Sequence, residues 1–158
     1  MSTQDFESAM RTIQDNVDTS DFMGARPDAL VRSAEAALGV KFPPSYRRFV
    51  TELGAGSIAG EEFYGVTTSD FEVSSVPNGI WLTLTQRKTS GLPKHLVLVY
   101  GVGNGQYFAL DTSKHSEDGE SPLVVWTPGA SKAEDELETA AADFGSFFLK
   151  TVRRAVGG

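Results

Sequence analysis

Apolar residues in the first part of the chain recur at the spacing of amphipathic helices. Between Asp5 and Asp18 they stand three or four residues apart, which predicts a helix with one buried face. The residues expected on that face are Phe6, Met10, Ile13 and Val17. Residues Thr19–Pro27 mix Ser, Asp, Gly and Pro, so this stretch is predicted to be a loop.

A succession of helices and breaks follows, from Ala34 to Gly65. A helix is predicted over Asp28–Leu38, ended by a left-handed Gly39. Its inward positions would be Leu30, Ala34, Ala37 and Leu38. Pro43 and Pro44 cannot continue a helix but suit the start of the next one, over Pro44–Leu53. The apolar stripe of that helix consists of Tyr46, Phe49, Val50 and Leu53. Gly-punctuated β-prone residues then predict a short strand or hairpin over Ser57–Tyr64.

The second half of the chain has strand-length apolar runs separated by turn residues. Leu96–Tyr100 and Gln106–Asp111 flank a glycine-rich turn and predict a hairpin. Leu123–Trp126 predicts a third strand, and Ala140–Ala155 a final helix. Three polar stretches are predicted loops: Thr67–Asn78, Thr112–Pro122 and the acidic Ser131–Glu138. Helices at both termini around a central set of strands indicate a single α+β domain over residues 1–158, with helices packed on a mainly antiparallel sheet.

A whole string of residues resembles the signature of the SUKH superfamily. It reads EAALGVKFPPSYRRFVTELGAGSI…EFYG, and later blocks follow in the family's order as GLPKHLVLVYGVGNGQYFALDTS, GESPLVVW and DFGSFFLKTV. The resemblance covers about Leu30 to Val152. It implies a helix over Ile80–Arg87, where β-branched and aromatic residues alone favour a strand. The superfamily includes bacterial immunity proteins against polymorphic toxins and a fungal regulator of cell-wall assembly.

Composition limits the classes of partner and compartment. The 158 residues suit one domain, and the net charge of -7 argues against general affinity for nucleic acid or anionic membranes. The chain has no cysteine, which excludes disulfides and thiolate chemistry. Neither a basic-then-apolar leader nor an apolar run of about 20 residues is present, so a cytoplasmic protein is expected.

Residues able to carry catalysis are scarce. The two histidines, His95 and His115, have no second ligand at metal spacing. Gly101–Gly105 is followed by neither a helix pattern nor a Lys-Ser/Thr pair, so a hairpin turn is favoured over a phosphate-binding loop. We therefore expect no catalytic residue, no metal site and no cofactor, and hence no enzyme.

Carboxylates are the candidates for partner binding. Between Asp111 and Asp143 nine acids face two bases. The acids are Asp111, Glu117, Asp118, Glu120, Glu134, Asp135, Glu136, Glu138 and Asp143, and the bases are Lys114 and Lys132. A solvated acidic face is the simplest interpretation, and a protein-binding face is the alternative. Asp111, at a strand end, also suits hydrogen bonding to its own loop.

Exposed aromatics beside acids would make interface anchors. Tyr64, Trp81, Tyr107 and Phe108 are predicted to be more open than the core phenylalanines, with Tyr107 and Phe108 on opposite faces of the sheet. Trp126 is expected under a terminal helix. The residues predicted to contact a partner are Glu61, Glu62, Tyr64, Tyr107, Asp111, Glu117, Asp118 and Glu120.

The resemblance implies a binding protein, in bacteria usually an immunity protein that blocks a cognate toxin domain. Many such toxins are nucleases, whose substrate grooves must be basic, and an acidic protein would associate with such a groove quickly. The alternative is a regulatory or scaffolding interaction domain of the cell-wall assembly type. The sequence leaves the oligomeric state open.

Overall fold

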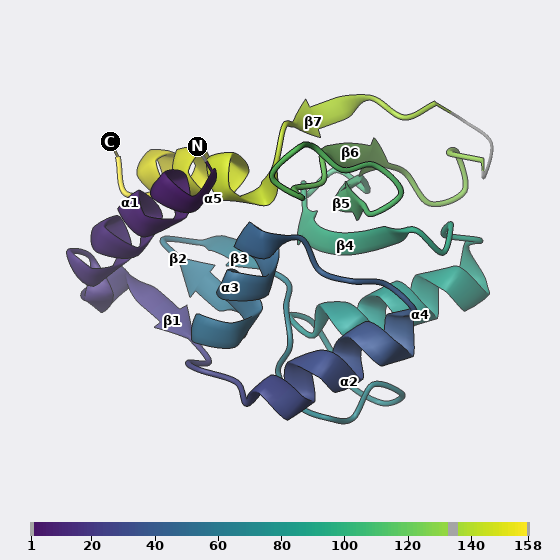
Figure 1. Cartoon of the computed structure of the whole chain (residues 1–158), viewed down its shortest axis with the longest axis horizontal. Helices are drawn as coiled ribbons and strands as arrows, with labels where there is room; N and C mark the ends of the chain where they lie inside the picture. Colours follow the sequence, from purple (N-terminus) through teal and green to yellow (C-terminus); the bar gives the residue numbers. More distant parts are fainter. Residues whose placement is uncertain (1, 133–135, 158) are drawn as a thin grey trace.

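The computed structural model describes residues 2–132 and 136–157, which form one α+β unit of five α-helices and a seven-stranded sheet (Figure 1). The helices are α1 (Ser2–Gln14), α2 (Asp28–Leu38), α3 (Pro44–Glu52), α4 (Gly79–Thr89) and α5 (Phe144–Ala155). The strands are β1 (Ser20–Phe22), β2 (Gly56–Ile58), β3 (Glu61–Phe63), β4 (Leu96–Gly101), β5 (Tyr107–Asp111), β6 (Leu123–Trp126) and β7 (Thr139–Ala141). The predicted fold class, with helices at both ends, is confirmed.

The strands lie in the sheet in their order along the chain, and every neighbouring pair is antiparallel. The hairpin of β4 and β5 has the most extensive register, whereas β3 and β4 share only the pair Phe63–Tyr100. Helix α4 and the loop before it are inserted between β3 and β4. The sheet therefore consists of a small part, β1–β3, joined by one residue pair to a larger part, β4–β7.

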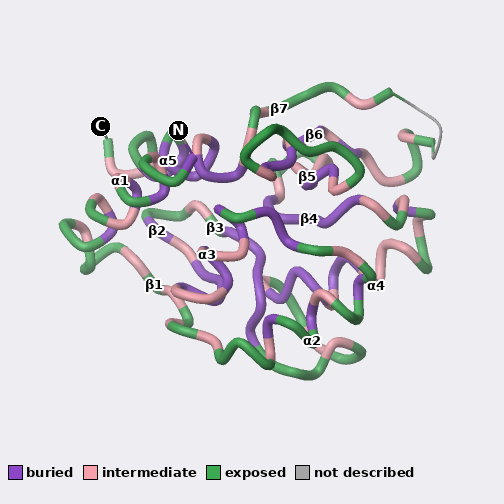
Figure 2. The backbone as a smooth tube through the Cα atoms, in the orientation of Figure 1, coloured by how far each residue is buried: buried purple, intermediate pink, exposed green. Residues whose placement is uncertain are grey.

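β4 is buried along nearly all of its length (purple in Figure 2), and its side chains pack on both sides of the sheet. On one side Val97 and Val99 join the main core, which includes Phe49 and the phenylalanines of α5. On the other side Leu96 and Leu98 join a second cluster around Trp126. Phe108 packs with the first cluster and Tyr107 with the second, so their predicted placement on opposite faces is confirmed. Trp126 lies in the cluster that includes Leu82 of α4, so the prediction that it packs under a terminal helix is wrong.

Short-range polar contacts fix the turn between α2 and α3. Gly39 adopts the left-handed conformation at φ 72° that the sequence predicts for the end of α2. Glu35 accepts a hydrogen bond from the backbone N–H of Phe42 at 2.7 Å and pairs with Arg47 at 2.5 Å. Arg47 also contacts Asp28 at 3.0 Å. These contacts hold the end of α2 against the start of α3.

Two three-residue strands lie where the sequence predicts other structure. β1 occupies part of the predicted loop Thr19–Pro27, and β7 lies at the predicted start of the final helix. That helix begins at Phe144, where the side chain of Asp143 accepts a hydrogen bond from the Ser146 N–H at 2.8 Å. Both strands are sheet edges, formed by pairing with β2 and β6 and not by a local pattern.

Helical spacing also misplaces two side chains. Val17 lies beyond the end of α1 with 67% of its surface exposed, and Ala37 faces solvent. In α2 the buried residues are Val31, Ala34 and Leu38. Val31 thus takes the place that the pattern assigned to Leu30, which is only partly buried.

The helix implied for Ile80–Arg87 is present, and polar residues explain it. The Asn78 side chain accepts hydrogen bonds from the N–H groups of Ile80 and Trp81, both at 3.1 Å, which caps the start of α4. Thr83 is buried, and its hydroxyl accepts the N–H of Leu98 at 3.1 Å. Thr83 is β-branched, and such residues favour a strand by local propensity. In this protein Thr83 lies in a helix, and its hydroxyl links α4 to β4.

Phe49 lies at the centre of the main core, fully buried among the rings of Phe63, Phe144 and Phe148. We expect Phe49→Ala to lower the free energy of unfolding by about 3–5 kcal/mol, because truncation leaves a cavity among rigid aromatic neighbours. Urea unfolding monitored by circular dichroism measures the change.

Val17→Ala is the matched control, since the apolar pattern of the sequence places Val17 in the core and the structure exposes it. Its unfolding free energy should stay within about 0.5 kcal/mol of wild type. Equal effects of the two substitutions would contradict the placement of both side chains.

Candidate partner-binding surface

The eight residues predicted to bind a partner do not form one surface. Glu61 pairs with Arg154 in the last turn of α5 at 3.4 Å. Glu117 and Asp118 instead line a groove with Asp143, the residue that caps the start of α5. Glu61 thus lies beside the C-terminal end of α5, and Glu117 and Asp118 lie beside its N-terminal end. Because a helix rises about 1.5 Å per residue, these two ends are roughly 16 Å apart along the axis.

Glu120 is buried, with only 3% of its surface exposed, so its expected place on the acidic face is wrong. Its carboxylate accepts hydrogen bonds from the N–H and the hydroxyl of Ser45, both at 2.9 Å, and from the hydroxyl of Ser2 at 3.0 Å. Ser45 Oγ in turn accepts the N–H of Gly145 at 3.0 Å. Glu120 therefore joins the N-terminal turns of α1, α3 and α5, a structural role.

Gly145 permits this convergence of three helices. A Cβ atom at this position would lie 2.5 Å from the backbone oxygen of Ser2, much closer than two such atoms can approach. Only a glycine lets the first turn of α5 lie so near the first turn of α1.

The exposed acids of the β5–β6 loop form a groove with the segment before α5. It measures about 450 Å³ and is lined by Ser116, Glu117, Asp118, Ala142 and Asp143. Asp118 accepts hydrogen bonds from the Ser116 hydroxyl and from the Glu120 N–H, the latter at 3.3 Å. The hydrogen bond from Ser116 lowers the pKa of Asp118, which further favours the charged carboxylate. We call this site the acidic groove.

The other predicted acids differ in their surroundings. Glu61 accepts hydrogen bonds from the Tyr100 hydroxyl at 2.9 and 3.0 Å, while Glu62 is exposed. Burial, and next the hydrogen bond to Glu61, raise the pKa of Tyr100 to about 12, so the phenol remains a donor. Of the nine acids counted between Asp111 and Asp143, Glu134 and Asp135 lie outside the described residues.

The two tyrosines predicted at the interface lie near each other, but one is largely inaccessible. Their ring centroids are 6.5 Å apart, in the cluster that contains Trp126. Tyr64 is only 9% exposed, and burial raises its pKa to about 12, so the expectation of an open Tyr64 is wrong. Tyr107 is half-buried and retains some accessible surface.

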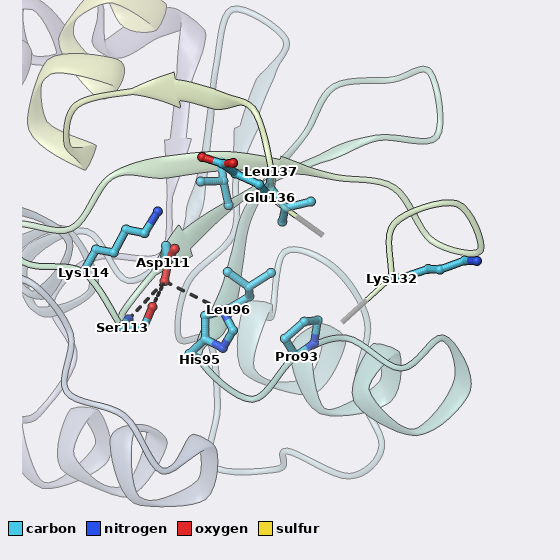
Figure 3. Close-up of a pocket in the computed structure, with 10 residues that line it drawn as sticks. Pro93, His95, Leu96, Asp111, Ser113, Lys114, Lys132, Glu136 and Leu137 are labelled. Carbon is cyan, nitrogen blue, oxygen red and sulfur yellow. Dashed lines mark hydrogen bonds and ion pairs between the residues drawn. The ribbon is translucent and has the colours of Figure 1, made fainter. Parts of the chain in front are cut away.

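Asp111 is buried at the end of β5, beside a small cavity of about 170 Å³ (Figure 3). Its Oδ1 accepts the N–H of Ser113 at 3.1 Å and the Ser113 hydroxyl at 2.5 Å, which is the loop hydrogen bonding that its strand-end position suggests. The Nε2 atom of His95 lies 3.9 Å from the same oxygen. Ser113 thus donates to the carboxylate, whereas in a Ser-His-Asp triad the serine donates to the imidazole.

The structure also brings together His95 and His115, which lie in different loops of the chain. Both line a groove of about 460 Å³ with Lys41 and Lys94. Position along the chain gave no sign of this, because Lys41 comes from the α2–α3 turn and the others from loops on either side of the β4–β5 hairpin.

Comparison with known families gives one decisive match. The SUKH_6 model, described as SMI1-KNR4 cell-wall, matches residues 28–148. The chain belongs to this SUKH family. A search of curated proteins finds no match.

Membership of the SUKH family narrows the biochemical role. The family covers immunity proteins and SMI1/KNR4-like proteins, which act through protein–protein interaction and are generally non-catalytic. Within residues 2–132 and 136–157, no three His, Asp or Glu side chains are grouped so as to hold a metal ion. No helix in the same ranges has the length and apolar character needed to cross a bilayer.

The buried carboxylate of this SUKH domain gives a pH prediction. Burial raises the pKa of Glu120, and the hydrogen bonds from Ser45 and Ser2 only partly oppose this shift. The folded state therefore binds a proton more readily than the unfolded state, so the stability that this proton provides is present at low pH and is lost as pH rises through the raised pKa. The unfolding free energy of wild type relative to Glu120→Gln should therefore fall as pH rises above the ordinary glutamate pKa of about 4.3.

Urea unfolding at a series of pH values measures this difference, with Glu117→Gln, an exposed neighbour in the same loop, as the control. The Glu117→Gln curve should run parallel to that of wild type. A wild-type advantage over Glu120→Gln that grows with pH would show that the hydrogen bonds outweigh burial.

Proposed function

We propose that this SUKH domain is an immunity protein that binds a cognate polymorphic toxin domain in the cytoplasm and blocks it. Family membership supports binding of a protein partner. The acidic groove supports the place of contact, because Glu117, Asp118 and Asp143 line it without a basic side chain among its lining residues. This concentration of carboxylates on an exposed loop is the observation that carries the proposal.

The acidic groove is fixed before any partner arrives. A hydrogen bond from the Ser116 N–H to the Glu120 carbonyl, at 2.8 Å, closes the loop, and the buried Glu120 side chain anchors it. Asp143 is held by its bond to Ser146. Carboxylates held in place lose little conformational entropy on binding, which favours rapid and specific association.

A nuclease is the toxin class that best complements this surface. Its substrate groove must be basic to hold phosphates, so an acidic loop can occupy the path of the nucleic acid. The net charge of -7 adds long-range attraction to the same partner.

A regulatory interaction domain is the second candidate. The description of the matching family, SMI1-KNR4 cell-wall, is the observation in its favour. The two functions differ in gene context, since an immunity gene is expected directly beside a toxin gene, and in whether the protein protects a cell that expresses that toxin.

Charge reversal tests the location of the toxin contact. The probe is the purified toxin domain encoded beside this gene, with an inactivated active site, and its association is followed by surface plasmon resonance at two salt concentrations. We expect Glu117→Lys to lower the association rate by about three- to tenfold at low salt, and less at high salt, because salt screens exposed charges.

Two exposed acids provide matched controls with the same change of net charge. Glu62→Lys tests the acids Glu61 and Glu62, which lie near the C-terminal end of α5, and Glu72→Lys tests the loop before α4. Both should leave the rate within about twofold of wild type if the contact is local. Equal effects of all three would show that only net charge matters, and a larger effect of Glu62→Lys would place the toxin at the other end of α5. A protein that neither binds the toxin nor rescues growth is not its immunity protein.

A further inference from the structure

A second groove, of opposite charge, is lined in part by the first residues of the β5–β6 loop. It measures about 460 Å³ and is lined by Gly39, Val40, Lys41, Lys94, His95, Thr112 and His115. Its described lining residues include two lysines and both histidines of the chain, and none of them carries a carboxylate. We call it the basic groove, and it stands out in a protein whose net charge is -7.

Hydrogen bonds outside the groove hold its walls together. The guanidinium of Arg87 donates to the carbonyl of Leu38 at 2.9 Å and to that of Lys94 at 2.7 Å, which joins the end of α2 to the α4–β4 loop. Thr112 donates to the carbonyl of His95 through its N–H at 2.9 Å and its hydroxyl at 2.7 Å. These two bonds join the start of the β5–β6 loop, the third segment of the groove, to the α4–β4 loop. Three segments distant in the sequence are thus fixed around one space.

The groups left for a ligand are hydrogen-bond donors. Lys41, Lys94 and His115 are exposed, and 44% of the His95 side chain is accessible. A lysine ammonium only donates, and an imidazole has at least one N–H to donate. The carboxylate of Asp111 does not line the basic groove; it is buried, 3.9 Å from His95 Nε2, and accepts the N–H and hydroxyl of Ser113 (Figure 3). The groove therefore complements anionic oxygens.

We propose that the basic groove binds the carboxylates of an acidic segment of a partner protein. Family members act through protein–protein interaction, so the anion is expected to belong to a polypeptide. The groove is also open along three loops and has no arginine among its lining residues, whereas bidentate arginine is typical of dedicated phosphate sites. This proposal depends on family membership and on the groove, and not on the acidic groove or on toxin immunity.

The probe is a fluorescein-labelled hexaglutamate peptide, with hexaglutamine as the uncharged reference. Fluorescence anisotropy should show that wild type binds hexaglutamate and not hexaglutamine. The double variant Lys41→Glu/Lys94→Glu should bind hexaglutamate about tenfold more weakly, since two attractive charges become repulsive. Both lysines are exposed, and circular dichroism checks that the variant remains folded.

Lys150→Glu controls for general attraction, because this exposed lysine lies on α5 outside the basic groove. It should alter hexaglutamate affinity by less than about twofold. Lys41→Glu alone and Lys94→Glu alone change the net charge by the same amount as Lys150→Glu, and a loss for Lys150→Glu as large as either of theirs would overturn the proposal.

The histidines supply a second, local readout. Both histidines of the chain line the basic groove, so their imidazole ¹H–¹⁵N signals in NMR report on it. His115 is the more specific of the two, because His95 also lines the small cavity beside Asp111. Hexaglutamate should shift both signals in a saturable manner. Anisotropy changes without imidazole shifts would place the peptide elsewhere and overturn the proposal. If inorganic phosphate shifts the imidazoles at lower concentrations than hexaglutamate does, the groove is a phosphate site and the protein-segment proposal is wrong.

Discussion

A buried carboxylate meets the N-terminal turns of three helices that lie far apart in the sequence. Glu120 bonds directly to Ser2 of α1 and Ser45 of α3, and through Ser45 it reaches Gly145 of α5. The unpaired N–H groups and the dipole of each helix give its N-terminus a partial positive charge, so three such ends would repel one another. The oxygens of Glu120 accept hydrogen bonds from these ends and let the helices pack closely, whereas burial raises the pKa of Glu120 and disfavours its charged form.

The arrangement of the molecule follows from this contact. Helices α1 and α5 lie side by side, which brings the two ends of the chain to one side of the molecule (Figure 1). The ring cluster around Phe49 fills the space beneath them. Because Glu120 lies at the end of the β5–β6 loop, the same bonds also determine where Glu117 and Asp118 stand. A contact that stabilises the core thus positions the acidic groove.

Sequence reasoning succeeded where local chemistry decides the structure. The stripe of α3, the left-handed Gly39 and the β4–β5 hairpin depend on neighbours a few residues away, and these predictions are confirmed. The strands β1 and β7 are only three residues long and form by pairing with β2 and β6, so no periodicity in their own residues reveals them. Glu120 looked like its exposed neighbours because its partners are 75 or more residues away. The two histidines were separated for the same reason, since the groove between them exists only after three loops meet.

The β5–β6 loop is fixed at both ends and exposed between them. Thr112 is bound to His95 and Glu120 to Ser45, while the intervening side chains, from Ser113 to Asp118, face solvent. Mutations between these anchors can change the charge on either side of the loop at little cost to stability. Substitutions in this one segment can therefore change the charge offered to a partner, whereas substitutions at Glu120, Ser45 or Gly145 would disturb the junction of three helix ends.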